Sequence, residues 1–237
     1  MPIAPEVRPA VSQVIFGAAL PAAERYAGLL IGAGVERGLV GPAEAGRIWD
    51  RHLLNCAVVA ELVPDQCLLA DLGSGAGLPG IVLALLRPGA DVILVEPMAR
   101  RVAFLTECVE VLGLPRVRVV RGRAEDLSGD ISADIVTSRA VAPLSKLAGW
   151  ATGLCRPGGT VLAIKGASAA DEVTRSQAEL RLLGISDLAV LQVGSGKVDP
   201  PATVVWFTAP RGVGRRPTRG RPKTGGRPHG RGSAGQA

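Results

Sequence analysis

A glycine-rich turn constrains this chain more strongly than any other feature of its sequence. Residues 69–80 read LADLGSGAGLPG, an apolar run that ends at Asp71 and passes directly into a loop with four glycines. Glycine tolerates the positive φ angles of a sharp turn, and its missing side chain lets a ligand approach the backbone. Pro79 suits the first position of a helix, which Leu83–Leu86 would continue. The segment therefore predicts a strand, a ligand-binding loop and a helix.

This turn alone is compatible with two classes of cofactor. Its last three glycines match G-x-G-x-x-G, the spacing with which dinucleotide folds place a pyrophosphate at a helix N-terminus, and Glu96 would then hold the ribose. Asp71, Gly73 and Gly75 instead form a D-x-G-x-G arrangement that resembles motif I of the class I S-adenosylmethionine methyltransferases. An acid and free backbone N–H groups suit the ammonium and carboxylate of that cofactor, and Glu96 suits its ribose hydroxyls. Both classes stay open on this segment.

Length and composition limit the classes of protein to which the chain can belong. With 237 residues and 24.3 kDa it has room for one ordinary domain plus appendages. The residues are 47% hydrophobic but only 3% aromatic, so the core must consist mainly of alanine, valine and leucine, which suits a parallel sheet covered by helices. Four widely spaced cysteines and two histidines predict neither disulfides nor a metal site. No secretory pattern or apolar run of ~20 residues is present, so we expect a cytoplasmic protein with no membrane partner.

Positive charge is concentrated at the C-terminal end. The net charge is +6, yet residues 211–237 hold seven arginines and one lysine without an acid, so residues 1–210 are mildly acidic. Arg211, Arg215 and Arg216 begin this stretch, which has few apolar residues and many glycines and prolines. We therefore expect 211–237 to be a disordered basic tail. Such a tail favours nucleic-acid backbone through counterion release, although a solubilising extension has the same composition.

The order of apolar segments predicts an α/β fold. Residues 1–64 carry apolar residues at helical spacing, interrupted at Pro21 and at Gly41-Pro42, and suggest a helical N-terminal cap. In 65–210, five predicted strands separated by stretches of helix length imply a parallel sheet with ligands at its C-terminal strand ends. Two further strands with no room for a helix between them predict an antiparallel hairpin. The predicted strands are Cys67–Leu72, Asp91–Val95, Val117–Val120, Asp134–Thr137, Gly159–Ile164, Leu188–Val193 and Thr203–Phe207.

Several short motifs together resemble one family. They are Arg51-His52, LADLGSGAGLPG, Glu96, Arg123-Ala124-Glu125, SRAVAPL at 138–144 and AIKG at 163–166. On these motifs the chain closely resembles the RsmG (GidB) family over residues 26–210. The resemblance implies the class I S-adenosylmethionine methyltransferase fold, a Rossmann-like seven-stranded sheet, with 65–210 as the methyltransferase domain.

The resemblance also implies an activity, a cofactor and a partner. Members of the family use S-adenosylmethionine to methylate N7 of a single guanine in the decoding-region loop of 16S rRNA, so the expected partner is 16S rRNA or the 30S ribosomal subunit. A monomer is the default state. Guanine N7 already carries an in-plane lone pair, so positioning suffices and no general base is needed. A methyltransferase with another RNA or a small-molecule acceptor, and a non-catalytic cofactor-sensing ribosome-binding factor, are the alternatives.

Individual roles follow from the resemblance residue by residue. The cofactor would lie against Asp71, Gly73, Gly75, Leu78, Glu96, Ala124, Glu125 and Arg139, with Glu96 at the ribose and Ala124 and Glu125 near the adenine. Arg139 and Lys165 would position the guanine through O6 or phosphate, because an enzyme that methylates N7 must leave that atom free. The alternatives are a surface ion pair for Arg139 and a first-turn helix acid for Glu125.

A set of basic residues is predicted to bind RNA around the same cleft. Arg100, Arg101, Arg123 and Lys165 follow the ends of neighbouring strands and would form a phosphate-binding rim. Arg51 and His52 resemble the family's R-H-x-x-D/N segment beside the cofactor entrance, although a helix-surface histidine that bonds a neighbour would look the same. Many family members carry W-N-x-x-x-N-L-T before this segment, whereas residues 34–50 here read GVERGLVGPAEAGRIWD.

Deleting residues 211–237 should weaken binding to rRNA and reduce its salt dependence without changing cofactor affinity. The deletion removes eight basic residues, and each lost phosphate contact lowers the slope of log affinity against log salt by about 0.7–0.9. Filter binding of the full-length and truncated chains at several salt concentrations measures this slope. Equal slopes would refute a nucleic-acid role for the tail.

Overall fold

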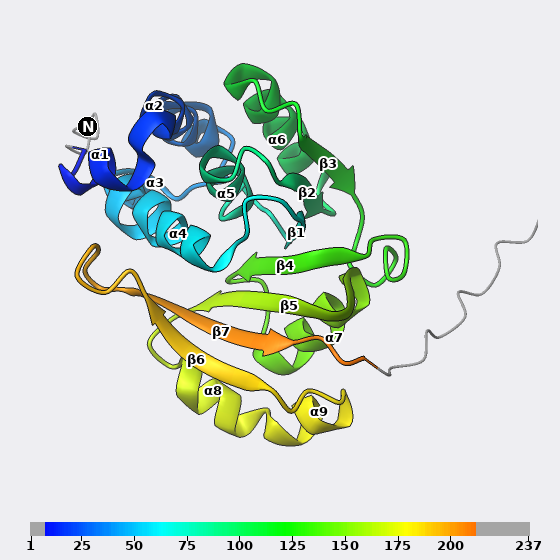
Figure 1. The fold of residues 1–237 in the computed structure, drawn as a ribbon. Helices are drawn as coiled ribbons and strands as arrows, with labels where there is room; N and C mark the ends of the chain where they lie inside the picture. Colours follow the sequence, from blue (N-terminus) through cyan, green and yellow to red (C-terminus); the bar gives the residue numbers. More distant parts are fainter. Residues whose placement is uncertain (1–7, 212–237) are drawn as a thin grey trace, which may run out of the picture.

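A seven-stranded sheet forms the centre of the computed structural model, which describes residues 8–211 (Figure 1). Its strands are β1 (Leu68–Leu72), β2 (Asp91–Glu96), β3 (Val117–Arg121), β4 (Ala133–Arg139), β5 (Cys155–Lys165), β6 (Leu188–Val193) and β7 (Ala202–Thr208). They lie in the order β3-β2-β1-β4-β5-β7-β6. β1 to β5 pair in parallel, and β7 is antiparallel to both β5 and β6. The predicted parallel sheet with a reversed C-terminal hairpin is confirmed.

Both faces of the sheet are buried at its central strands, whereas the edge strands β3 and β6 are partly exposed. In β2, Val92 and Leu94 pack into the hydrophobic cluster on one face, while Ile93 and Val95 pack into the cluster on the other. Successive side chains of a strand point to opposite faces, so a strand that is covered on both sides is apolar throughout. This explains why the strands could be located in the sequence from short continuous runs of valine, leucine and isoleucine.

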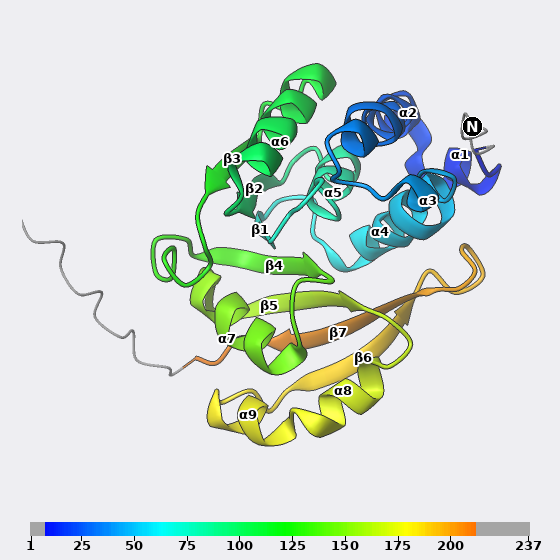
Figure 2. The ribbon, with the colours of Figure 1, turned by 180° about the vertical axis from the view of Figure 1, so that it is seen from behind.

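Helices cover the two faces in separate groups (Figures 1 and 2). The N-terminal helices lie on one face with α5 (Gly80–Leu86) and α6 (Ala99–Leu112), whereas α7 (Leu144–Leu154), α8 (Ala169–Arg175) and α9 (Gln177–Leu182) cover the other. α6 buries Phe104, Leu105, Cys108 and Leu112, which share one side of the helix. It ends at Gly113, whose φ of 63° is the left-handed conformation that terminates many helices.

The N-terminal helices form the helical cap (residues 8–64), which shares a core with the sheet. The cap comprises α1 (Val11–Phe16), α2 (Leu20–Leu29), α3 (Pro42–Ala45) and α4 (Asn55–Ala57), with 3₁₀ segments at Gly17–Ala19 and Val58–Leu62 and π segments at Leu30–Gly34 and Ile48–Leu54. Tyr26, Leu30, Ile48 and Leu53 are fully buried in the same cluster as α5 and α6. The boundary between residues 64 and 65 stays a prediction, since one continuous core spans it.

The helical stretch Val11–Gly34 is long and apolar enough to cross a membrane by length and composition alone. Glu24 and Arg25 lie near its middle, and Glu24 pairs with Arg8 at 2.9 Å. Pro21 does not break the stretch, because it occupies the second residue of α2, where its missing N–H needs no helical partner. Since the core helix of a soluble protein passes the same test, this feature is only weak evidence of a membrane.

The connection between β3 and β4 differs from its prediction. The sequence predicts a stretch of helix there, but residues 122–132 form turns and an isolated bridge between Ser128 and Ile131. Gly129 adopts a φ of 85°, which a regular helix excludes, so a helix cannot run through the connection. The helix prediction is wrong at this place, and Glu125 lies in a turn instead of a first helical turn.

Substitution of Gly80 can test how closely the glycine turn packs against the sheet. A Cβ on Gly80 would lie 2.4 Å from Leu94 Cδ2 and 2.7 Å from Asp71 Oδ2. We expect Gly80→Ala to lower the free energy of unfolding by about 1–3 kcal/mol through overpacking. Gly28→Ala is the control, because a Cβ at this exposed helical position meets nothing within 4 Å, and it should raise stability by up to about 1 kcal/mol. Urea unfolding of both variants measures the two effects, and effects of the same sign would contradict the packing argument.

Candidate active site

A cavity of about 560 Å³ lies at the C-terminal edge of the sheet, at the ends of β1, β2 and β4. The connections turn in opposite directions at the β1–β4 boundary, since β2 and β3 lie on one side of β1 and β5 lies beyond β4. Open α/β sheets bind ligands at such a switch point. The cap supplies one wall of the cavity, with Leu39, Val40, Gly41, Glu44, Ile48 and His52.

The glycine loop forms the floor of this cavity and needs its glycines. Gly73, Gly75 and Gly77 adopt φ values of 68°, 61° and 101°, which favour glycine over any residue with a side chain. A Cβ on Gly77 would also lie 2.5 Å from Ile81 Cδ1. The hydroxyl of Tyr26 in the cap donates a hydrogen bond to the Ala76 carbonyl oxygen at 2.7 Å. The cap therefore holds the loop directly.

Asp71 lies beneath the loop and does not line the cavity. Its fully buried carboxylate accepts hydrogen bonds from the Gly80 N–H at 3.1 Å and from the Thr137 hydroxyl at 3.2 Å. Burial raises the pKa of Asp71 from 3.8 to about 6, against the lowering effect of these hydrogen bonds. Asp71 thus joins β1 to β4 and to the start of α5, and it supports the cofactor loop from below.

Glu96 lies at the end of β2 and does line the cavity. One carboxylate oxygen accepts the Gly75 N–H at 3.0 Å, and the other accepts the Met98 N–H at 2.9 Å. Arg101 lies 3.6 Å from the first of these oxygens. The residue is 1% exposed, so its negative charge is fixed at one place in the wall. A fixed carboxylate of this kind suits a ligand that carries hydroxyl groups.

Most of the predicted cofactor residues meet in this one cavity. Gly73, Gly75, Leu78, Glu96, Ala124, Glu125 and Arg139 all line it, together with Ser74, Met98 and Trp150. Ala124 and Glu125 come from the turns between β3 and β4. Among residues 8–211, no group of three histidine, cysteine, aspartate or glutamate side chains could hold a metal ion.

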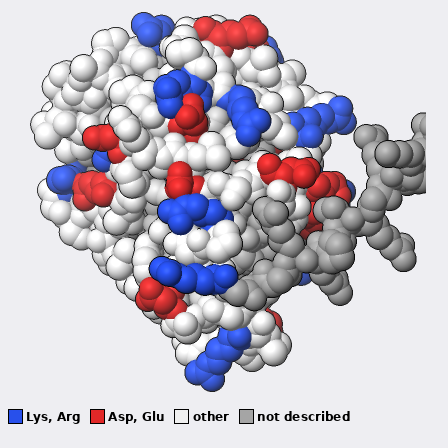
Figure 3. Space-filling model, turned by 45° about the vertical axis from the view of Figure 1, so that its right-hand side comes forward, with Lys and Arg blue, Asp and Glu red and all other residues white. Residues whose placement is uncertain are grey.

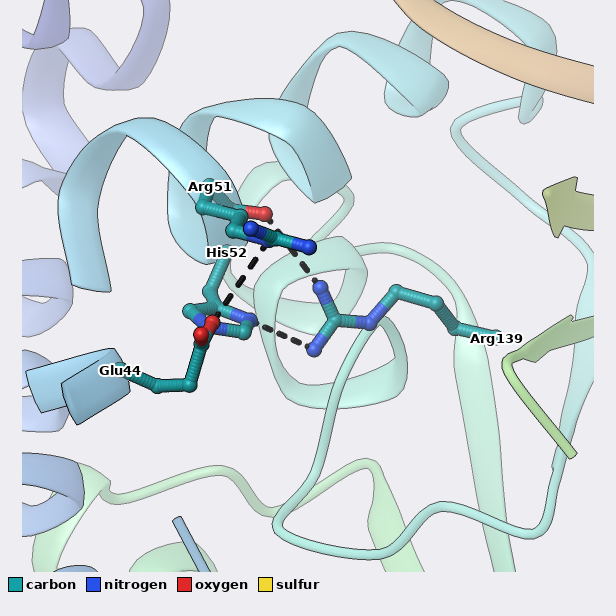
Figure 4. Close-up of polar contacts among 4 residues, drawn as sticks. All are labelled: Glu44, Arg51, His52 and Arg139. Atoms are coloured by element: carbon teal, nitrogen blue, oxygen red, sulfur yellow. Dashed lines mark hydrogen bonds and ion pairs between the residues drawn. The ribbon is translucent and has the colours of Figure 1, made fainter. Parts of the chain in front are cut away.

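Arg139 is the last residue of β4, and its side chain points to Arg51 and His52 of the cap (Figure 4). Its Nη2 lies 2.8 Å from Nδ1 of His52, and its Nη1 donates to the Arg51 carbonyl oxygen at 3.4 Å. Nε2 of the same imidazole lies 2.8 Å from Oε2 of Glu44. The next residue, Ala140, has a φ of 52°, a left-handed conformation that costs about 1 kcal/mol outside glycine. The backbone thus turns sharply where the guanidinium leaves the sheet.

The imidazole of His52 is neutral, although it lies between the charged groups of Arg139 and Glu44. Burial, followed by the positive charge of Arg139, lowers the pKa of His52, and the hydrogen bond with Glu44 only partly opposes these effects. The same hydrogen bond lowers the pKa of Glu44, so its carboxylate keeps its charge. The alternative prediction for His52 is a helix-surface histidine that bonds a neighbour. The structure shows such bonds, to Glu44 and Arg139, and it also places His52 in the wall of the cavity.

The predicted basic residues are only partly brought together. Arg101 and Arg123 line the cavity, whereas Arg51, Arg100, Lys165 and Arg211 do not. Lys165 donates to the Ala142 carbonyl oxygen at 2.8 Å and pairs with Glu172 at 3.0 Å. Arg215 and Arg216 lie outside the described residues. On the face shown in Figure 3, lysine and arginine side chains are interspersed with aspartate and glutamate and do not form one basic patch.

Sequence reasoning missed three residues that shape the site, namely Tyr26, Glu44 and Thr137. Tyr26 is the chain's single tyrosine, and a buried tyrosine usually has a partner for its hydroxyl, so its rarity was a usable signal. Glu44 lies eight residues before His52, in α3, the short helix that precedes the segment of His52. It falls in the region where the chain departs from the family motif, and it carried no signal. Thr137 stands beside Ser138-Arg139 but lies inside a strand, where a partner depends on tertiary packing.

Comparison with known proteins gives a family that accounts for this site. The model of the family described as rRNA small subunit methyltransferase G matches residues 19–199. The chain belongs to this family. The ribosomal RNA small subunit methyltransferase G of Thermobifida fusca is 54% identical over 217 residues, covering 90% of this chain and 92% of the relative. The protein of the same name from Mycolicibacterium gilvum is 54% identical over 219 residues, covering 90% and 95%. The predicted membership of the RsmG (GidB) family is confirmed.

Solved structures share the fold at low sequence identity. TYW2 of P. horikoshii, solved in complex with MeSAdo, has a TM-score of 0.52 and 17% identity, covering 66% of this chain and 61% of that one. A SAM-dependent methyltransferase from Aquifex aeolicus has a TM-score of 0.50 and 18% identity, covering 65% and 89%. The predicted class I methyltransferase fold is therefore confirmed for this member of the rRNA small subunit methyltransferase G family.

Asp71 should make the stability of the fold depend on pH. Its pKa rises from 3.8 to about 6 on folding, so between these values the folded state binds more protons than the unfolded state. Stability contributed by Asp71 is then complete below about pH 4, falls as pH rises to about 6 and is constant above. Relative to Asp71→Asn, the wild type should lose about 3 kcal/mol of unfolding free energy across this window. Urea unfolding at pH 4 to 7 measures the difference, and a constant difference would overturn the assignment.

Proposed function

We propose that this chain transfers the methyl group of S-adenosylmethionine to N7 of one guanine in the decoding-region loop of 16S rRNA. The supporting observation is the single cavity in which the glycine loop and Glu96 face Arg139 and the cap. Family membership supports the reaction class, because relatives with half of their residues identical are named rRNA small subunit methyltransferases. The partner would be 16S rRNA or the 30S subunit, with a monomeric enzyme in the cytoplasm.

The residues at the floor of the cavity fit S-adenosylmethionine. A Cβ on Gly75 would meet only the Gly73 carbonyl oxygen, at 3.8 Å, so a ligand has room beside the backbone at this position, whose N–H is bonded to Glu96. Glu96 would accept hydrogen bonds from the ribose hydroxyls, while Ala124 and Met98 offer apolar contact to the adenine. The cofactor supplies an electrophilic methyl group on a sulfonium. The loop and Glu96 fix where that group lies.

The opposite wall would position the guanine. N7 attacks with its existing lone pair, so the chain needs no general base and acts by holding the base in line with the methyl donor. Arg139 would contact O6 or a phosphate and leave N7 free. Arg101 and Arg123, at the edge of the same cavity, would bind the RNA backbone. Because Arg139 lines the cavity and Lys165 does not, we assign the positioning role to Arg139.

Methyl transfer from labelled S-adenosylmethionine to 30S subunits from cells that lack the gene tests this function. The site of transfer is mapped by chemical cleavage at N7-methylguanine. Label on a single guanine of the decoding-region loop supports the reaction and the substrate together. Cofactor binding without transfer to 30S subunits or extracted rRNA would overturn the proposal and favour another acceptor or a non-catalytic role in ribosome binding.

Arg139→Ala should separate positioning from cofactor binding. We expect kcat/KM for methyl transfer to fall by about 100-fold, since the base loses its alignment, while cofactor affinity measured by calorimetry stays nearly unchanged. Glu96→Gln should show the reverse pattern, with weakened cofactor binding. Arg156→Ala is the matched control, because this exposed arginine pairs with Asp134 at 2.6 Å and does not line the cavity. Equal losses in the two arginine variants would contradict the role of Arg139.

A further inference from the structure

The hydrogen bonds of His52 connect the cap to the end of β4 (Figure 4). Glu44 belongs to α3, His52 to the π segment Ile48–Leu54, and Arg139 to the last position of β4. The imidazole contacts the carboxylate and the guanidinium at 2.8 Å each, one at either ring nitrogen. Its side chain is 14% exposed. All three residues line the cavity, so these hydrogen-bonded side chains close the site on the cap side.

The direction of each hydrogen bond follows from the chemistry of the partners. A guanidinium has donors only and keeps its charge at any ordinary pH. Nδ1 of His52 must therefore accept the hydrogen bond from Arg139, which requires it to carry no proton. The proton of the neutral ring then resides on Nε2, which donates it to the Glu44 carboxylate. The structure is consistent with a single tautomer of a single protonation state.

We propose that His52 is a positioning residue that aims the Arg139 guanidinium through Nδ1, and that Glu44 fixes the tautomer that this requires. Arg139 has a long side chain with several rotatable bonds, and within residues 8–211 its guanidinium has two hydrogen-bond partners, His52 and the Arg51 carbonyl oxygen. Both partners lie in the cap. The cap therefore sets the position of the residue that contacts the guanine. This inference rests on the proposed function, because it concerns the same site.

Loss of the neutral imidazole would release Arg139. The charged groups that face His52 are Glu44 from α3, Arg51 from its own segment and Arg139 from β4. Protonation at Nδ1 would replace an acceptor with a donor and set two positive charges side by side. The pKa of His52 is lowered by burial and by Arg139, so this change falls below its ordinary value of about 6.5. Methyl transfer should consequently decline on the acid side of this value.

Two amide substitutions distinguish this role from direct RNA binding. The side-chain amide of asparagine lies near the position of Nδ1, whereas that of glutamine lies near Nε2. His52→Gln removes the acceptor for Arg139, and we expect kcat/KM to fall by about 10- to 100-fold, the effect of losing one hydrogen bond to a charged group. His52→Asn restores an acceptor for Arg139 and should recover most of this loss. Equal losses in both variants would overturn the proposal.

The pH profile gives a readout that a structural role would not move. In the wild type the acid limb of kcat/KM should report His52, and in His52→Asn this limb should flatten. Asp71 also titrates near pH 6, so an acid limb that persists in His52→Asn would assign it to Asp71 and contradict the proposal. Thermal unfolding of both His52 variants shows whether either loss reflects the fold.

Glu44→Gln tests the contact between Glu44 and His52. A glutamine oxygen can still accept the Nε2 proton, but the charge that favours the imidazolium is lost, so the pKa of His52 should fall and the acid limb should move to lower pH. Glu61→Gln is the control, since this carboxylate pairs with Lys197 at 2.7 Å elsewhere in the cap region and does not line the cavity. An acid limb that stays in place in Glu44→Gln would contradict the assignment of Glu44.

Failure of this inference and failure of the proposed function give different results. If the chain does not methylate guanine N7, the wild type itself transfers no label to the decoding-region guanine. If the wild type is active but the asparagine and glutamine variants at position 52 behave alike, the function stands and the positioning role of His52 is rejected.

Discussion

The buried carboxylate of Asp71 is the interaction on which the geometry of the site depends. It belongs to β1, accepts the N–H of the first residue of α5 and accepts the hydroxyl of Thr137 in β4. A buried carboxylate without hydrogen bonds would be strongly unfavourable, so these three elements must meet in one arrangement. The glycine loop runs between the fixed points at Asp71 and Gly80, and this places the Gly75 N–H against Glu96 at the end of β2. One buried group thus sets the position of the loop and, through it, the shape of the cavity floor.

Features with a local cause could be predicted from the sequence. The glycine turn, the apolar strands and the reversed hairpin depend on nearby residues, and all were located. The stretch between β3 and β4 was not, because Gly129 and the turns around it replaced the expected helix. Tyr26, Glu44 and the contact between His52 and Arg139 depend on how the cap packs against the sheet. Residues 52 and 139 carry no mark of their proximity in the sequence, and only the fold brings them to 2.8 Å.

The cap acts as part of the site and not as a separate lid. Tyr26 holds the glycine loop through Ala76, His52 holds Arg139, and apolar cap residues line the cavity. These contacts reach the cofactor side and the base side alike. Because the cap shares one hydrophobic core with α5 and α6, the two sides are fixed relative to each other by the same packing. A cofactor and a base that enter this cavity therefore meet walls that were positioned together.

Lys165 illustrates how a residue near the site can matter without touching it. Its ammonium group pairs with Glu172 of α8, whose same carboxylate oxygen also accepts the N–H of Leu144, the first residue of α7, at 2.7 Å. Truncation of Lys165 would leave this carboxylate without its cation and loosen the junction of β5, α7 and α8. The same helix α7 carries Trp150, which lines the cavity. An alanine scan scored by activity would then group Lys165 with Arg139, although Lys165 acts on the scaffold and Arg139, in the proposed function, acts on the base. On this side of the sheet, sensitivity to substitution and proximity to the reacting atoms are separate properties.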